Sequence, residues 1–109
     1  MKTTVRIMLD FLQGPIWGSD IETGEPMTGA SVVDTDSVVR ELNQNCADLY
    51  NGYYEFDSHD QACWFNYEQE KADKDKMLSL ITQLIERLNE INDGSFVIED
   101  LETERLKNL

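Results

Sequence analysis

The most regular hydrophobic pattern of the chain lies between Asp73 and Asn92. Its apolar residues are Met77, Leu80, Ile81, Leu84, Leu88 and Ile91, with Ile85 beside them. They recur every three or four positions, which is the period of an α-helix with one buried face. Asp73 is a suitable N-cap, and Asp93-Gly94 is a stop signal. The pattern predicts a helix over Asp73–Asn92, and we expect Leu80–Leu88 to be among the best-protected parts of the fold.

A second helical pattern runs from Asp34 to Asn51. Its apolar stripe consists of Val38, Val39, Leu42, Cys46, Leu49 and Tyr50, and its polar face consists of Glu41, Asn43, Gln44, Asn45 and Asp48. Asp34 or Thr35 can cap this helix by accepting hydrogen bonds from its first N–H groups, with Asp36 in the first turn. Gly52 can end it in a left-handed conformation.

Alternating apolar and polar residues predict a β-strand over Thr3–Leu12. One face carries Val5, Ile7, Leu9 and Phe11. Met8 and Leu12 on the other face favour a central strand over an edge strand. A short apolar run predicts the last strand, Ser95–Ile98. The final segment, Glu99–Leu109, has leucines spaced among charged residues, so it forms either a short helix packed on the domain edge or a frayed tail.

The stretch Tyr53–Tyr67, with the sequence YYEFDSHDQACWFNY, predicts a β-hairpin. Two runs rich in aromatic residues, Tyr53–Asp57 and Ala62–Tyr67, lie on either side of the polar tetrad Ser58-His59-Asp60-Gln61. Aromatic residues suit a pleated, half-buried surface, and a polar tetrad lets the chain reverse. Because the stretch holds six of the ten aromatic residues, we expect it to supply much of the core.

The segment between the first strand and the first helix has no regular period. Gln13-Gly14-Pro15 breaks the strand, and Thr23-Gly24-Glu25-Pro26 is a turn signal in which Gly24 can take a positive φ. Apolar residues lie on both sides of this turn, so the segment forms either a loose hairpin or a long ordered loop. Trp17 is expected to act mainly as a packing lid.

The predicted elements follow the order β, α, β-hairpin, α, β, with a possible extra N-terminal hairpin. This is the βαββαβ order of split β-α-β folds. We therefore expect an α+β fold in which two amphipathic helices cover one face of a mixed four-stranded sheet. A chain of 109 residues is expected to form one domain, residues 1–109. No apolar run approaches the ~20 residues that span a bilayer, and the start lacks a signal-peptide pattern, so we expect a cytoplasmic protein.

Charge is the compositional property that most limits the function. The chain has a net charge of −13, and residues 7–70 account for −12 because they carry thirteen acidic residues and Arg40 as their one base. An acidic surface repels nucleic acids and anionic membranes, and it attracts basic proteins at long range. The acidic residues either form a surface that binds a partner or serve only to keep the protein soluble.

Catalytic and metal-binding chemistry has little support in the sequence. His59 is the only histidine, and Ser58, His59 and Asp60 cannot form a triad because the side chains of neighbouring residues point apart. The sequence around His59 also lacks the spaced acidic residues, central glycine and closing glutamate of a calcium-binding loop. Cys46 and Cys63 have no C-x-x-C spacing and are expected to be free thiols. We predict no enzyme activity, cofactor or metal site.

Recognition of another protein is the leading hypothesis for the function. A small acidic domain without a catalytic motif is typical of inhibitors that neutralise a basic protein, such as the immunity protein or antitoxin of a bacterial toxin. One alternative is a phage-encoded nucleic-acid mimic that inhibits a nuclease, as anti-CRISPR proteins do. Another is a small regulatory or metabolic domain whose acidity has no role.

The predicted partner-binding residues combine aromatic anchors with acidic side chains, because aromatic residues supply much of the affinity of interfaces and charges speed the encounter. They are Trp17, Asp48, Tyr53, Tyr54, Glu55, Asp57 and Asp60. Most of them belong to the predicted hairpin. The expected partner is a basic protein, with no direct binding of nucleic acid or membrane.

Overall fold

The centre of the fold is a parallel pair of strands, β1 (Thr3–Ile7) and β4 (Phe96–Asp100), in which Val5 lies opposite Ile98. This is seen in a computed structural model, which describes residues 2–10, 14–20, 23–58 and 61–109, with the backbone alone at 57–58 and 61–62. Val5 and Ile7 are fully buried and Phe96 is 1% exposed. Both predicted strands are present, although β1 ends at Ile7 and not at Leu12, which is outside the described residues.

The other edge of β1 is occupied by the segment that follows it. Ile16 pairs with Ile7 in an antiparallel bridge, the Met8 N–H donates to the Pro15 carbonyl at 2.7 Å, and the Trp17 N–H donates to the Arg6 carbonyl at 3.0 Å. β1 therefore has backbone partners on both sides. The predicted central position of this strand is thus confirmed.

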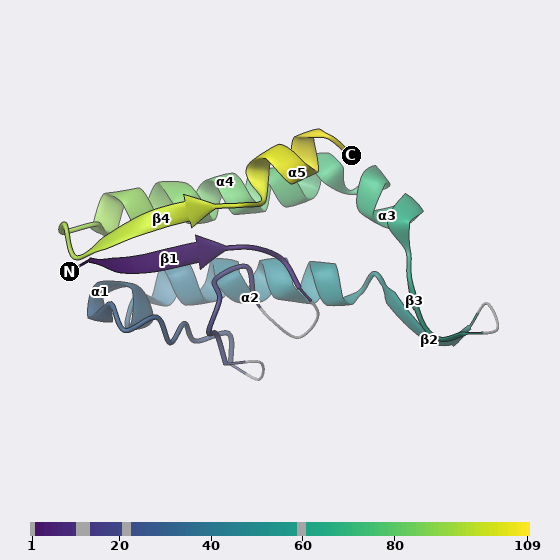
Figure 1. Cartoon of the computed structure of the whole chain (residues 1–109), viewed down its shortest axis with the longest axis horizontal. Coiled ribbons are helices and arrows are strands. Elements are labelled where there is room, and N and C mark those ends of the chain that lie inside the picture. The colour runs from purple at the N-terminus through teal and green to yellow at the C-terminus, as the bar shows by residue number, and fades with distance from the viewer. Residues whose placement is uncertain (1, 11–13, 21–22, 59–60) are drawn as a thin grey trace.

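Two long helices, α2 (Ser37–Asn51) and α4 (Lys74–Ile91), pack against each other and lie behind the two strands in Figure 1. Their buried faces include Val39, Cys46, Tyr50, Met77, Ile81, Leu84 and Leu88. Both helices were predicted from the three-and-four spacing of these residues. The α+β class is confirmed, with two amphipathic helices on one face of the β1–β4 pair.

The predicted four-stranded sheet is wrong. The strands β2 (Tyr54–Ser58) and β3 (Gln61–Phe65) form the expected antiparallel hairpin, but within the described residues the hairpin is a sheet of its own. It extends beyond the end of α2 in Figure 1. The radius of gyration is 14.3 Å, larger than the ~13 Å of a compact domain of similar length. The hairpin cannot join β1 because the segment at Pro15–Trp17 already occupies that edge.

The ends of the first long helix also differ from the prediction. The N-cap of α2 is Asp36, whose carboxylate accepts from the N–H groups of Val38 at 2.9 Å and Val39 at 3.2 Å. Asp34 instead ends an unpredicted short helix, α1 (Ser31–Asp34). Gly52 has φ −65° and is right-handed, so the left-handed cap is also wrong.

Two short helices complete the chain. One of them, α3 (Tyr67–Ala72), was not predicted. Its N-cap is Asn66, whose side chain accepts a hydrogen bond from the Gln69 N–H at 3.0 Å. The helical alternative for the C-terminal segment is confirmed by α5 (Thr103–Lys107), with Leu106 fully buried. Within the described part of the chain, no helix has the length and apolar composition needed to cross a bilayer.

The segment before α1 is the loose hairpin of the two predicted alternatives. Ser19 pairs with Pro26, and Gly24 has φ +72° at the turn. The turn is fixed to α2 by Asn43, whose Oδ1 accepts from the Ile16 N–H at 3.0 Å and whose Nδ2 donates to the Gly24 carbonyl at 2.9 Å. Asn43 lies on the polar face predicted for this helix, but it is completely buried because this segment folds over it.

Replacing Asn43 by alanine should lower the free energy of unfolding by about 2 kcal/mol, because the buried Ile16 N–H and Gly24 carbonyl lose their partner. Urea unfolding measures this change. The control is Asn45→Ala on the exposed face of the same helix, which should change stability by no more than about 0.5 kcal/mol. Equal effects of the two substitutions would show that the Asn43 amide does not hold this segment.

Candidate functional site

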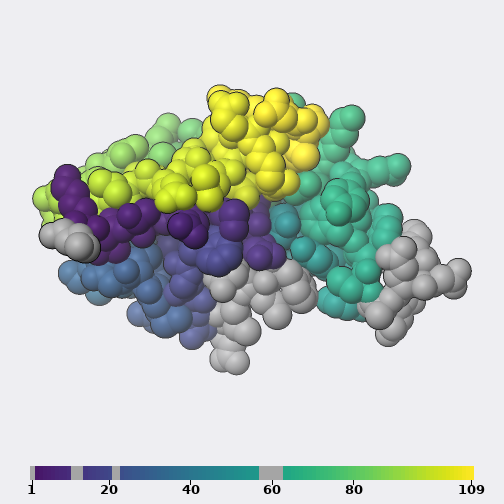
Figure 2. All heavy atoms as spheres, viewed as in Figure 1, coloured from purple at the N-terminus to yellow at the C-terminus, as the bar shows by residue number. Residues whose placement is uncertain are grey.

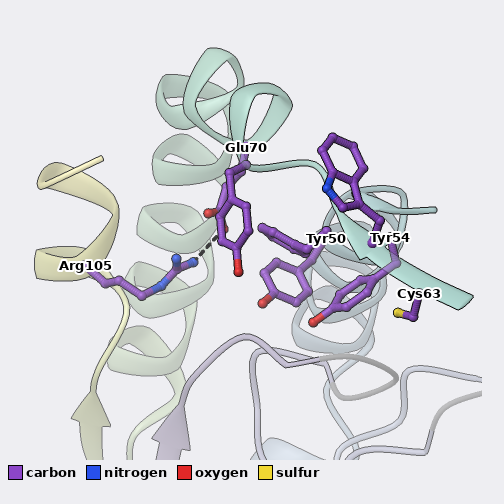
Figure 3. Close-up of a pocket in the computed structure, with 8 residues that line it drawn as sticks. Tyr50, Tyr54, Cys63, Glu70 and Arg105 are labelled. Carbon is purple, nitrogen blue, oxygen red and sulfur yellow. Dashed lines mark hydrogen bonds and ion pairs between the residues drawn. The ribbon is translucent and has the colours of Figure 1, made fainter. Parts of the chain in front are cut away.

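The most distinctive surface feature is a cavity of about 520 Å³ at the base of the hairpin (Figure 3), which we call the aromatic cavity. Its aromatic lining residues are Tyr50, Tyr54, Trp64, Phe65 and Tyr67. Glu70, Arg105 and Cys63 complete the lining. Four segments thus contribute: the end of α2, the hairpin, α3 and α5.

The hairpin register brings the aromatic rings together. Tyr54 lies opposite Phe65 and Phe56 lies opposite Cys63, so these four residues share one face of the hairpin, since residues paired across a sheet point to the same side. The ring centroids of Tyr54 and Phe65 are 4.9 Å apart, and those of Phe65 and Tyr67 are 4.7 Å apart. The Tyr50 ring joins them from the last turn of α2, 5.5 Å from Phe65.

A charged cluster forms the side of the aromatic cavity opposite the hairpin. Arg105 donates from Nη2 to Glu70 at 2.9 Å and from Nε to Glu102 at 2.8 Å. Glu70 is 3% exposed and Glu102 is 1% exposed. The second oxygen of Glu102 accepts from the Leu9 N–H at 2.8 Å. One cation between two carboxylates leaves this cluster with a net charge of −1, and it joins α3 and α5 to the chain that leaves β1.

Burial and hydrogen bonding shift the pKa values of the groups around the aromatic cavity. Burial raises the pKa of Glu102, and the hydrogen bonds from Arg105 and the Leu9 N–H oppose this rise. Burial lowers the pKa of Arg105, but its hydrogen bonds with Glu70 and Glu102 outweigh burial and raise the pKa overall. Burial and a hydrogen bond with Tyr54 raise the pKa of Tyr50. At neutral pH, Arg105 is therefore charged and the Tyr50 hydroxyl is neutral.

Among the partner-binding residues predicted in the hairpin, the structure brings Tyr54 to the aromatic cavity. Tyr53 is 2% exposed and its hydroxyl donates to Asp73 at 3.0 Å, so its side chain belongs to the interior. Glu55 is half-buried and lies opposite Trp64. The backbone of Asp57 is in β2, and Asp60 is outside the described residues.

Trp17 and Asp48 lie away from this cavity. The indole N–H of Trp17 donates to the Met8 carbonyl at 3.1 Å, and its half-buried ring lines a separate hollow beside β1. Asp48 is exposed on α2, where it accepts from the Gln44 side chain at 2.7 Å. The structure therefore does not gather the predicted residues into one site.

Tyr54 is the one described lining residue of the aromatic cavity that the sequence assigned to a site. The other seven were missed, and they are Tyr50, Cys63, Trp64, Phe65, Tyr67, Glu70 and Arg105. Tyr67 is 70% exposed, and its position at the end of the aromatic run was the one available signal. Glu70 and Arg105 are 35 positions apart, and the spacing of charges along the chain does not reveal such a pair. Figure 2 shows the surface of the C-terminal helix (yellow) directly beside the teal segment that precedes α4.

Both cysteines are free, as predicted. Under native conditions a maleimide should modify the exposed Cys63 rapidly and leave Cys46 unmodified, because Cys46 is fully buried and burial raises its pKa to about 12. Mass spectrometry counts the modified thiols. In denaturant without reductant, two should react. Rapid native modification of Cys46 would contradict its place in the core.

No group of three His, Cys, Asp or Glu side chains placed to hold a metal ion occurs in the described part of the chain. His59 is outside that part. The chain matches no family model, no curated protein and no solved structure. The candidate site that the described residues form is a cavity in which aromatic rings lie beside buried charges.

Proposed function

We propose that this protein is a non-enzymatic binding protein that docks on a basic protein through its hairpin and the adjoining aromatic cavity. In its most specific form the proposal is an immunity protein or antitoxin that neutralises a basic toxin. The exposure of large aromatic side chains on the projecting hairpin and at the start of α3 is the observation that supports it most strongly. Phe56, in β2, is 58% exposed, and Tyr67, the first residue of α3, is 70% exposed.

Exposed aromatic residues and a one-sided charge support the proposal together. Tyr and Trp are enriched among the residues that dominate binding energy, and interface cores are enriched in aromatic residues generally. The hairpin lies within residues 7–70, which carry a charge of −12. A field of that sign accelerates the encounter with a basic protein, and the effect weakens as salt screens it.

The test begins with capture of the binding protein from an extract of the source organism, followed by titration of the purified pair. The double variant Phe56→Ala, Tyr67→Ala should weaken the affinity at least about thirtyfold if both rings are anchors. The matched control is Val38→Ala, Val97→Ala, which removes two apolar groups that are also exposed, at 41% and 42%, but lie on α2 and β4. The control should leave the affinity within about threefold of the original.

Two further measurements separate neutralisation from simple binding. Association should slow as the salt concentration rises, and the captured protein should lose its own toxic or enzymatic activity when the complex forms. Equal effects of the two double variants would place the interface outside the hairpin. An association rate that does not depend on salt would show that the acidic surface serves solubility alone.

A further inference from the structure

We propose that the aromatic cavity receives an arginine side chain of the basic partner. This inference rests on the proposed function, and it specifies which chemical group of the partner the cavity recognises. The proposed ligand is a cation, even though one lining residue, Arg105, is itself positively charged.

The rings are arranged as the walls of a box. The planes of Tyr54 and Phe65 meet at 70°, those of Phe65 and Tyr67 at 66°, and those of Tyr50 and Tyr54 at 67°. Neighbouring rings are therefore steeply inclined to one another, so the cavity is bounded by ring faces and edges in several orientations. A cation over the face of an aromatic ring is attracted by the ring quadrupole, and sites with several aromatic walls are known to recognise cations.

The charges around the aromatic cavity also favour a cation. Arg105 is already held by Glu70 at 2.9 Å and Glu102 at 2.8 Å, so its charge is more than balanced within the cluster. An entering guanidinium therefore meets a formal local charge of −1 from Arg105, Glu70 and Glu102. Figure 3 shows Arg105 and Glu70 reaching the cavity from the side opposite Tyr50 and Tyr54, which leaves the ring side for the incoming group.

Arginine fits this cavity better than lysine. Its guanidinium is planar, stacks on aromatic faces and carries five N–H donors. The neutral Tyr50 hydroxyl, whose pKa is raised by burial, can accept one of them. The volume of about 520 Å³ falls within the range of ~300–1,000 Å³ that is typical of ligand pockets, so the whole side chain can enter.

The test uses a short probe, acetyl-Gly-Arg-Gly-amide, with the citrulline peptide as its uncharged counterpart of nearly equal shape. In ¹H–¹⁵N spectra, the arginine peptide should shift the Trp64 indole and Arg105 Nε signals in a saturable way. The citrulline peptide should bind about tenfold more weakly, because the cation–π attraction is lost. The arginine peptide should also slow maleimide modification of Cys63, which lines the same cavity. Equal binding of the two peptides would overturn the proposal.

A matched pair of variants locates the binding. Tyr67→Leu removes a ring that lines the aromatic cavity, and Phe56→Leu removes an exposed ring of the neighbouring hairpin that is not part of the lining. Tyr67→Leu should weaken binding of the arginine peptide several-fold, whereas Phe56→Leu should leave it unchanged. Equal weakening by the two variants, or shifts that spread over the acidic surface without saturating, would refute the assignment. The Cys63 protection measured on the unaltered protein gives an independent answer if Tyr67→Leu does not fold.

Failure of this inference can be distinguished from failure of the proposed function. If binding of the captured protein still depends on Phe56 and Tyr67 but the arginine peptide does not bind in the cavity, the proposed interface stands. The proposal that the cavity receives an arginine of the partner is then wrong. If binding of the captured protein does not depend on Phe56 and Tyr67, and binding of the arginine peptide does not depend on Tyr67, both proposals are wrong.

Discussion

Replacing Leu84 by alanine will lower the free energy of unfolding by about 2–5 kcal/mol, the cost of deleting a fully buried leucine side chain and leaving a cavity. Leu84 is fully buried at the centre of α4 and belongs to the hydrophobic core. The change removes apolar contacts in this core. Urea unfolding of the purified protein measures it. Amide exchange should agree, with the Leu84 N–H among the slowest to exchange.

The matched control for this prediction is Glu86→Ala, two positions along the same helix on its exposed face. It should change stability by no more than about 0.5 kcal/mol. A loss below about 1 kcal/mol for Leu84→Ala would mean that the interior near α4 is not closely packed. Fast exchange of the Leu84 amide would contradict the place of α4 in the core.

Replacing Arg105 by methionine should cost about 3 kcal/mol of stability, because it leaves the buried carboxylates of Glu70 and Glu102 without their cation. We expect the lower end of the range for broken buried ion pairs, since the Arg105 side chain is 39% exposed and water reaches it. The control is Arg6→Met. Its ion pair with Glu99 is 3.4 Å long, with both side chains more than 40% exposed, so the loss should not exceed about 1 kcal/mol.

The pH dependence of the Arg105 variant provides a second check. Burial raises the pKa of Glu102 above its ordinary value of 4.5, and loss of Arg105 should raise it further. A carboxyl whose pKa is higher in the folded state takes up its proton on folding, so the folded state gains relative stability as the pH falls through that raised pKa toward 4.5. The deficit of Arg105→Met should therefore shrink between pH 7 and pH 4.5. A deficit that does not change with pH would show that lost packing of the arginine stem, and not the unpaired charge, is the cause.

Patterns of short range predicted most of the elements correctly. The three-and-four spacing in Met77–Ile91 predicted α4 with bounds close to the observed ones, since one apolar stripe determines which face of a helix is buried. Alternation identified β1, a short apolar run identified β4, and aromatic runs around a polar tetrad identified the β2–β3 hairpin. Helix caps were less predictable, because several residues near each end can serve. Asp36 caps α2 because Asp34 is already used by the preceding turn, where it accepts from Thr28 at 2.9 Å.

The pairing of strands could not be predicted from these patterns. The alternation in β1 shows which of its faces is buried, but it does not specify which segments pair with its edges. The segment at Pro15–Trp17 occupies one edge of β1, and β4 occupies the other. The hairpin forms a sheet of its own, and Phe56 on it and Tyr67 at the start of α3 are exposed. This arrangement turned an expected contribution to the core into a candidate binding surface.

The sequence by itself determined the α+β class, the long helices, the hairpin and the charge of −12 over residues 7–70, because each depends on neighbouring residues or on composition. The tertiary structure alone decided that Tyr53 faces the interior while Tyr54 lines the aromatic cavity, and that Asn43 is buried. It also decided that Arg105 meets Glu70 across 35 positions of the chain. Such contacts depend on how whole elements pack, and spacing along the chain carries no information about a side chain that arrives from another element.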